Sequence, residues 1–145
     1  MTAQTAAGEI ILHASCVAFE DRGLLILGPS GCGKSSLALT LIGLGARLVA
    51  DDRTILQRRG DGVMARCPDA LRGMIEARGI GLLHADAVTE VQVRLVVDLE
   101  QIEAERLPPK RQVTLLQVSL DLVLGQDAAH FPFALLQALR GGRRA

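Results

Sequence analysis

The stretch that most restricts the fold is LLILGPSGCGKSSL, at residues 24–37. A run of four apolar residues leads into residues 28–35, which fit the pattern G-x-x-x-x-G-K-[ST]. Glycines let backbone N–H groups turn inward around phosphate oxygens, and a helix N-terminus adds a partial positive charge. The pattern therefore predicts a phosphate-binding loop between a buried strand and a helix.

Within this loop, Lys34 is expected to reach the β- and γ-phosphates of a nucleotide, and the Ser35 hydroxyl can ligate Mg²⁺. Cys32 has no activating histidine or second cysteine near it in the sequence, so we interpret it as a spacer. The predicted nucleotide-binding residues are Gly28, Pro29, Ser30, Gly31, Cys32, Gly33, Lys34, Ser35 and Ser36.

Composition and length favour a single globular domain over residues 1–145. Hydrophobic residues make up 49% of the chain and charged residues 22%, and a chain of this size buries about 70% of its unfolded surface. Sixteen basic and sixteen acidic side chains cancel, and Trp and Tyr are absent. This composition argues against a nucleic-acid surface.

The N-terminus and the cysteines indicate a cytoplasmic protein. The first residues lack a basic start and a long apolar core, and no apolar run approaches the ~20 residues needed to span a bilayer. Cys16, Cys32 and Cys67 are odd in number and widely spaced, so neither a zinc site nor a disulfide framework is supported. We interpret Cys16 and Cys67 as small buried hydrophobic residues.

Hydrophobic periodicity predicts an α/β chain. Apolar runs and alternating stretches indicate strands, Gly-Asp-Gly at residues 60–62 indicates a hairpin turn, and a 3.6-residue repeat indicates helices. The predicted strands cover residues 24–27, 47–52 and 90–100, and residues 9–19 and 112–125 each form a strand or a pair of strands. The hairpin covers 54–67, and the helices cover 34–44, 69–79 and the region of 130–142.

Two carboxylates end the strand that follows the loop helix, in the sequence VADD. Parallel strands place their C-terminal ends beside the phosphate site, so Asp51 and Asp52 are expected near the γ-phosphate. Adjacent strand residues point to opposite faces, so at most one of the two should face the reacting group directly. An acidic turn in solvent remains the alternative.

Three further residues fit ordinary roles when each is taken alone. Glu76 would be a helix-surface residue, His13 a hydrogen-bonded strand histidine, and Arg106 a solvated loop charge. Taken with the loop, however, the sequence resembles the catalytic domain of the HPr kinase/phosphorylase family, which phosphorylates a serine of the phosphocarrier protein HPr. The resemblance rests, in order, on LHAS, GPSGCGKSS, GARLVADDR and IEARGIG, the last being the most discriminating, and it covers about residues 9–100 well.

The resemblance implies an ATP- and Mg²⁺-dependent protein-serine kinase with an α/β P-loop domain and a mixed sheet, similar to phosphoenolpyruvate carboxykinases. It implies His13 as the active-site histidine and Asp52 as the acid/base, with Lys34 on the phosphates. It further implies Ser35 and Glu76 as Mg²⁺ ligands, Arg106 as a catalytic arginine, HPr as the partner, and a hexamer.

The chain also departs from the family pattern. The N-terminal domain of longer members has no counterpart here, so the chain resembles the short branch of the family. LLHADAVTE is shorter than the usual glycine-rich stretch, and VTLLQVSLDLVLG lacks the expected basic Pro-Gly-Arg loop. The kinase direction is therefore better supported than the reverse, phosphate-dependent reaction. A small-molecule P-loop kinase and a non-catalytic ATP-binding regulatory module remain alternatives.

Overall fold

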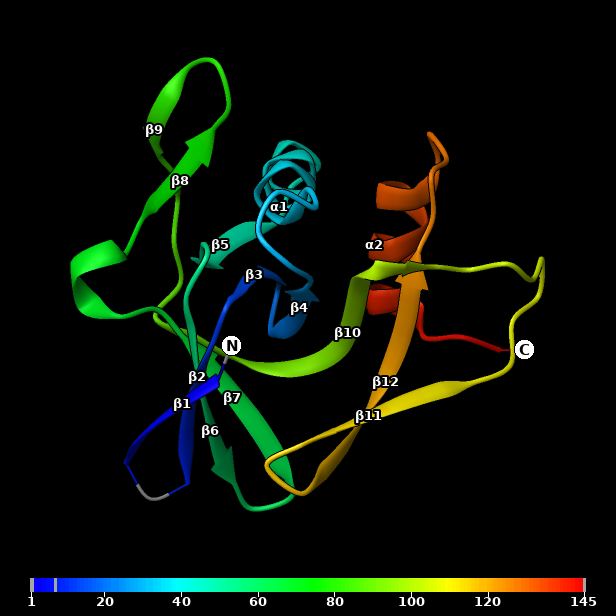
Figure 1. Cartoon of the computed structure of the whole chain (residues 1–145), viewed down its shortest axis with the longest axis horizontal. Helices are drawn as coiled ribbons and strands as arrows, with labels where there is room; N and C mark the ends of the chain where they lie inside the picture. Colours follow the sequence, from blue (N-terminus) through cyan, green and yellow to red (C-terminus); the bar gives the residue numbers. More distant parts are fainter. Residues whose placement is uncertain (1, 7, 145) are drawn as a thin grey trace.

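The computed structural model describes residues 2–6 and 8–144 and has an α/β architecture, with a curled mixed sheet and two helices on one side of it (Figure 1). The helices are α1 (Lys34–Gly43) and α2 (Phe131–Gly141), and a 3-10 turn, η1, covers Asp69–Leu71. The strands are β1 (Thr2–Ala6), β2 (Glu9–Leu12), β3 (Ala14–Phe19), β4 (Arg22–Leu27), β5 (Arg47–Ala50), β6 (Thr54–Arg59), β7 (Gly62–Arg66), β8 (Met74–Ala77), β9 (Gly81–His84), β10 (Glu90–Ile102), β11 (Arg111–Leu115) and β12 (Val118–Gly125).

In the described part of the chain, ten strands form one sheet, with the order β1-β2-β6-β7-β10-β4-β3-β5, and with β12 paired to β10 and β11 paired to β12. The start of β10 pairs antiparallel with β7, and residues from Leu95 onward pair parallel with β12. On its other edge β10 runs parallel to β4. The sheet thus curls along the long, bent strand β10. The mixed sheet predicted from the sequence is confirmed.

Two hydrophobic clusters fill the two sides of the sheet. On the helix side, Leu37 and Leu41 of α1 and Leu135 of α2 pack against Leu24 and Ile26 of β4. On the other side, the curled sheet closes on itself around a second cluster that includes Leu25, Leu56 and Val96. Alternation along β4 therefore divides its side chains between the two clusters. Packing on both faces holds this strand, which leads into the phosphate loop, in place.

Most elements lie where the sequence pattern predicts them, and one prediction is wrong. The helix expected at residues 69–79 is instead the turn η1 followed by β8, which forms a two-stranded sheet with β9. Gly73 and Gly79 both have positive φ, at 75° and 87°, which a continuous helix does not accept. Burial alternates along β8, with Ile75 and Ala77 buried and Glu76 exposed, which is the period of a strand.

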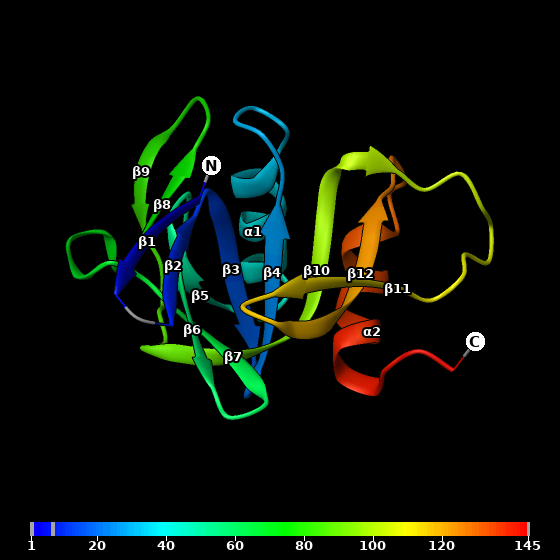
Figure 2. The same cartoon turned by 60° about the horizontal axis from the view of Figure 1, so that its bottom comes forward.

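Strand directions place the phosphate loop at one end of the molecule. β4, β10 and β12 are parallel, and β5 runs in the same direction because β3 is antiparallel to both β4 and β5. The C-terminal ends of these strands therefore meet at one edge, where the loop after β4 leads into α1 (Figure 2).

Candidate functional site

The loop between β4 and α1 is built tightly around its glycines. Gly28 has φ of 148°, and a Cβ at this position would lie 2.4 Å from Cys32 Sγ. Gly33 is left-handed, with φ of 102°, and immediately precedes the first residue of α1. Glycine is required at Gly28 by its angle and its close packing and at Gly33 by its angle alone, so the backbone is free to turn its N–H groups toward an anion at the helix N-terminus.

Lys34 lies across the loop. Its side chain is buried, at 6% exposure, and Nζ donates to the carbonyl oxygens of Gly28 and Pro29 at 2.8 and 3.1 Å. An ammonium group is a compact charge with three donors on a flexible stem. The same group can therefore hold the loop together without a ligand and turn to phosphate oxygens with one.

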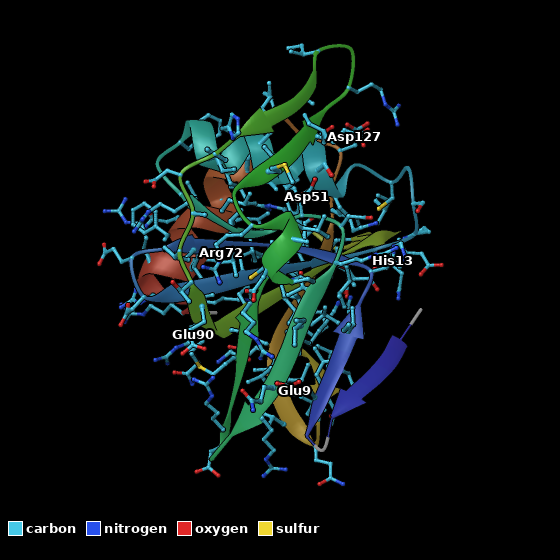
Figure 3. The ribbon with its side chains drawn as sticks, turned by 90° about the vertical axis from the view of Figure 1, so that its left-hand side faces the viewer. Glu9, His13, Asp51, Arg72, Glu90 and Asp127 are labelled. Carbon is cyan, nitrogen blue, oxygen red and sulfur yellow. The ribbon has the colours of Figure 1, made fainter. Side chains whose placement is uncertain are left out.

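Asp51 connects three elements. Its Oδ1 accepts hydrogen bonds from the Ser35 hydroxyl at 2.7 Å and from the Ser15 hydroxyl at 2.9 Å, and its Oδ2 accepts from the Glu76 backbone N–H at 3.1 Å. These bonds join α1, β3 and β8 to the end of β5. Figure 3 shows Asp51 beneath the β8–β9 hairpin, with His13 farther toward the right-hand edge.

Asp52 has different surroundings. Its Oδ1 lies 3.4 Å from His13 Nδ1, and both side chains are substantially exposed. β5 ends at Ala50, and Asp52 has a positive φ of 68°, which is not strand backbone, so strand alternation does not separate the two aspartates. The two carboxylates thus have separate partners, for a reason that the sequence pattern did not predict.

Ser15 was not identified from the sequence. Its side chain is fully buried, and its hydroxyl donates to Asp51 while accepting the Asp52 backbone N–H at 3.2 Å. One hydroxyl therefore fixes both aspartates relative to β3. Its only sequence signal is position, two residues after His13, and its partners are more than 35 residues away.

A cavity of about 350 Å³ unites most of the predicted residues. Arg78, which sequence reasoning also missed, lies two residues after Glu76, and both side chains line this cavity. The full lining is Ser30, Gly31, Gly33, Lys34, Ser35, Ser36, Asp51, Asp52, Glu76 and Arg78. Three carboxylates thus face two cations, so the phosphate groups of a nucleotide would need an additional cation here.

That cation fits the oxygen donors of the cavity. Mg²⁺ is bound in proteins through one or two carboxylates together with substrate phosphates and water, and Ser35 and Glu76 supply a hydroxyl and a carboxylate at its wall. Within the described ranges, no three His, Cys, Asp or Glu side chains form a metal cage by themselves. The donor set therefore suits a metal that arrives with a nucleotide.

His13 and Arg106 lie outside this cavity. His13 lines a neighbouring hollow of about 550 Å³ on the other side of the loop, together with Pro29, Asp98 and Glu100. Arg106 is exposed in the connection between β10 and β11, beside Glu103 and Pro108. Figure 1 shows this connection on the right, with the β8–β9 hairpin on the left. Within a single chain, His13 lies beside Asp52, whereas Arg106 lies away from the phosphate loop.

The cysteines behave as the sequence suggested. Cys16 and Cys67 are buried, and burial raises the pKa of both thiols, which keeps them in the unreactive, protonated form.

Neither helix in the described part of the chain is both long and apolar enough to cross a bilayer.

The chain is similar to a well-defined group of proteins. The family described as HPr Serine kinase C-terminal domain matches residues 4–122. The HPr kinase/phosphorylase of Cupriavidus necator is 36% identical over 142 residues, which cover 90% of this chain and 44% of that protein. The HPr kinase/phosphorylase of Alkaliphilus metalliredigens is 38% identical over 110 residues, covering 70% of this chain and 36% of that protein. The chain thus spans less than half the length of these relatives.

A solved structure has the same fold. The Hpr(Ser) kinase/phosphatase from Coxiella burnetii superimposes with a TM-score of 0.75 at 25% identity, covering 90% of this chain and 93% of that chain. The phosphate loop, the paired aspartates and the carboxylate on β8 all lie within the matched residues 4–122. The chain belongs to the HPr Serine kinase C-terminal domain family.

Proposed function

We propose that this domain transfers the γ-phosphoryl group of ATP to a serine of HPr, in a reaction that depends on Mg²⁺. The observation that carries the proposal is one cavity lined by Lys34, Ser35, Asp52 and Glu76, with His13 3.4 Å from Asp52. A pure nucleotide sensor would need the loop but would have no use for an acid/base carboxylate. We infer HPr as the acceptor of the phosphoryl group from the relatives, which are named HPr kinase/phosphorylase.

The chemical step divides among the residues as follows. The acceptor serine oxygen forms a bond to the γ-phosphorus as the bond to the ADP oxygen breaks, and the serine proton passes to the Asp52 carboxylate. His13 holds that carboxylate in place. Lys34 releases Gly28 and Pro29 and binds phosphate oxygens, where its charge stabilises the transferring group. Mg²⁺, held by Ser35 and Glu76, would neutralise phosphate charge.

The acceptor and the nucleotide approach from different sides of the loop. The 350 Å³ cavity contains the helix N-terminus and Lys34, which suit phosphates, whereas the 550 Å³ hollow opens beside His13. The His13–Asp52 pair bridges the two. We therefore assign the larger hollow to the acceptor serine and its flanking residues.

The remaining features of the proposal rest on the family. We propose a cytoplasmic homo-oligomer, a hexamer by analogy, that binds neither nucleic acid nor membrane. Arg106 would reach the transferring phosphoryl group only from a neighbouring subunit or after a movement of its loop, because one chain keeps it apart. The reverse reaction, attack of phosphate on phosphorylated HPr, is the weaker part of the proposal.

The test is incubation of the purified chain with γ-labelled ATP, Mg²⁺ and purified HPr, followed by mapping of the label. Label on an HPr serine supports the proposal. Label on a metabolite from an extract favours a small-molecule kinase, and nucleotide binding without transfer favours a regulatory module. A second incubation of phosphorylated HPr with inorganic phosphate measures the reverse direction.

A further inference from the structure

A second cavity, of about 430 Å³, lies at the opposite end of the molecule from the phosphate loop. Its walls come from Arg22 at the start of β4, from β10, from the β11–β12 pair and from the C-terminal turn of α2. Figure 2 shows the end of α2 at the bottom of the molecule and the phosphate loop at the top. The six residues of β4, about 20 Å of extended chain, separate the two. This cavity is therefore distinct from the nucleotide site.

The charge of this cavity is strongly one-sided. Six of the sixteen Lys and Arg side chains of the chain line it, against one carboxylate, Asp121. The six are Arg22, Arg94, Lys110, Arg111, Arg140 and Arg143. Since the chain as a whole has no formal net charge, this concentration is local and creates a positive potential in a concave surface, where field lines are focused.

Several of these cations have no carboxylate partner. Arg22 donates to the carbonyl oxygens at the end of α2, and Arg111 pairs with Glu103 at 2.9 Å. Arg94 and Lys110 form no side-chain hydrogen bond or ion pair within residues 2–6 and 8–144, and Arg140 lies over the Phe19 ring, 5.2 Å from its centroid. At least three positive groups are thus left without a negative partner.

Apolar residues line the cavity beside the cations. Leu95, Leu122, Val123, Ala138 and Leu139 contribute to the lining. A long basic stripe would suit a nucleic-acid backbone, but a hollow of this size with apolar lining residues suits a small molecule with a carbon skeleton.

We propose that this cavity binds a small organic anion with two or more negative charges, supplied by phosphoryl or carboxyl groups. Arg94, Lys110 and Arg140 would contact the charged groups, because they are the cations without a carboxylate. Arg22 and Arg111 would add potential while keeping their present partners. The inference does not depend on the proposed kinase activity, since it concerns binding at the other end of the molecule.

The test uses methylenediphosphonate and citrate as probes, titrated calorimetrically into the whole chain carrying Lys34→Ala, which weakens phosphate binding at the loop. The cavity variant adds Arg94→Gln and Lys110→Gln. A matched control adds Arg47→Gln and Arg72→Gln, which removes the same two charges from exposed ion pairs elsewhere. Amide shifts of Gly141 and Gly142, followed by NMR, locate the bound probe.

We expect at least one probe to bind, to shift the amides at the end of α2, and to bind about tenfold more weakly in the cavity variant, because two charge-assisted contacts are lost. The control should change affinity by less than about twofold. If the probe bound equally weakly to both variants, the loss of affinity would come from general surface charge, and the proposal would be overturned. Binding of neither probe would overturn it too.

Discussion

Asp51 and Asp52 are neighbours in the chain, yet their surroundings differ in almost every respect. Asp51 accepts three hydrogen bonds that join β3, α1 and β8. The Asp52 side chain is 57% exposed, and its Oδ1 lies 3.4 Å from His13 Nδ1. A carboxylate with several donors organises the structure around it, whereas a carboxylate with free lone pairs can accept a proton. The comparison therefore predicts a positioning role for Asp51 and a reacting role for Asp52.

The largest expected effect comes from removing the Lys34 charge from the cavity that both carboxylates line. Lys34→Ala should reduce transfer to HPr below detection, because no other cation in the loop replaces its ammonium. The structure also predicts a modest loss of stability, about 1–2 kcal/mol, since two hydrogen bonds to loop carbonyls disappear. Single-turnover transfer and denaturant unfolding measure the two effects. Normal transfer by this variant would place the active site elsewhere.

The comparison itself is tested by the pair Asp52→Asn and Asp51→Asn. Removal of a general base lowers the rate by about 10²- to 10⁴-fold, so Asp52→Asn should lose transfer on that scale while it keeps nucleotide binding and stability. Asp51→Asn should mainly lower stability and metal affinity, because the amide presents donors where three donors already point. If Asp51→Asn were inactive and Asp52→Asn active, the roles would be reversed.

Ser15 sharpens the comparison because it holds both aspartates at once. Ser15→Ala leaves Asp51 without one donor and the Asp52 N–H without its acceptor, so it should destabilise the fold by about 1–3 kcal/mol. Thr54→Val is the matched control, since the Thr54 hydroxyl is equally buried but bonds only to the Ala14 carbonyl. Both variants should lower the unfolding midpoint, and only Ser15→Ala should also lower kcat. A normal kcat would make Ser15 purely structural.

The smallest expected effect concerns Glu76. Glu76→Gln should raise the Mg²⁺ concentration needed for half-maximal transfer several-fold and leave thermal stability nearly unchanged, because the side chain is exposed and only its backbone N–H bonds to Asp51. Glu20→Gln, at the opposite end of β4, controls for the lost negative charge. An unchanged Mg²⁺ requirement would remove Glu76 from the metal site.

Sequence reasoning succeeded where short-range pattern determines structure. The phosphate loop, the helix at Lys34 and the strands around them follow from glycine positions and apolar runs that lie within a few residues of one another. Residues 69–79 were mispredicted because Leu71 and Ile75 have helical spacing, whereas the positive φ of Gly73 and the pairing with β9 decide for a strand. Ser15 was missed because its role depends on contacts with residues 36 and 37 positions away.

The self-bonded Lys34 has a consequence for the rate at which nucleotide binds. Before a phosphate can occupy the loop, the ammonium must leave the carbonyls of Gly28 and Pro29. If ATP is the nucleotide, as proposed, each encounter with it would compete with this internal contact, so we expect some collisions to end without capture. Association slower than diffusion follows, as it does wherever binding needs a conformational change, and in exchange the protein keeps its loop ordered while no nucleotide is present.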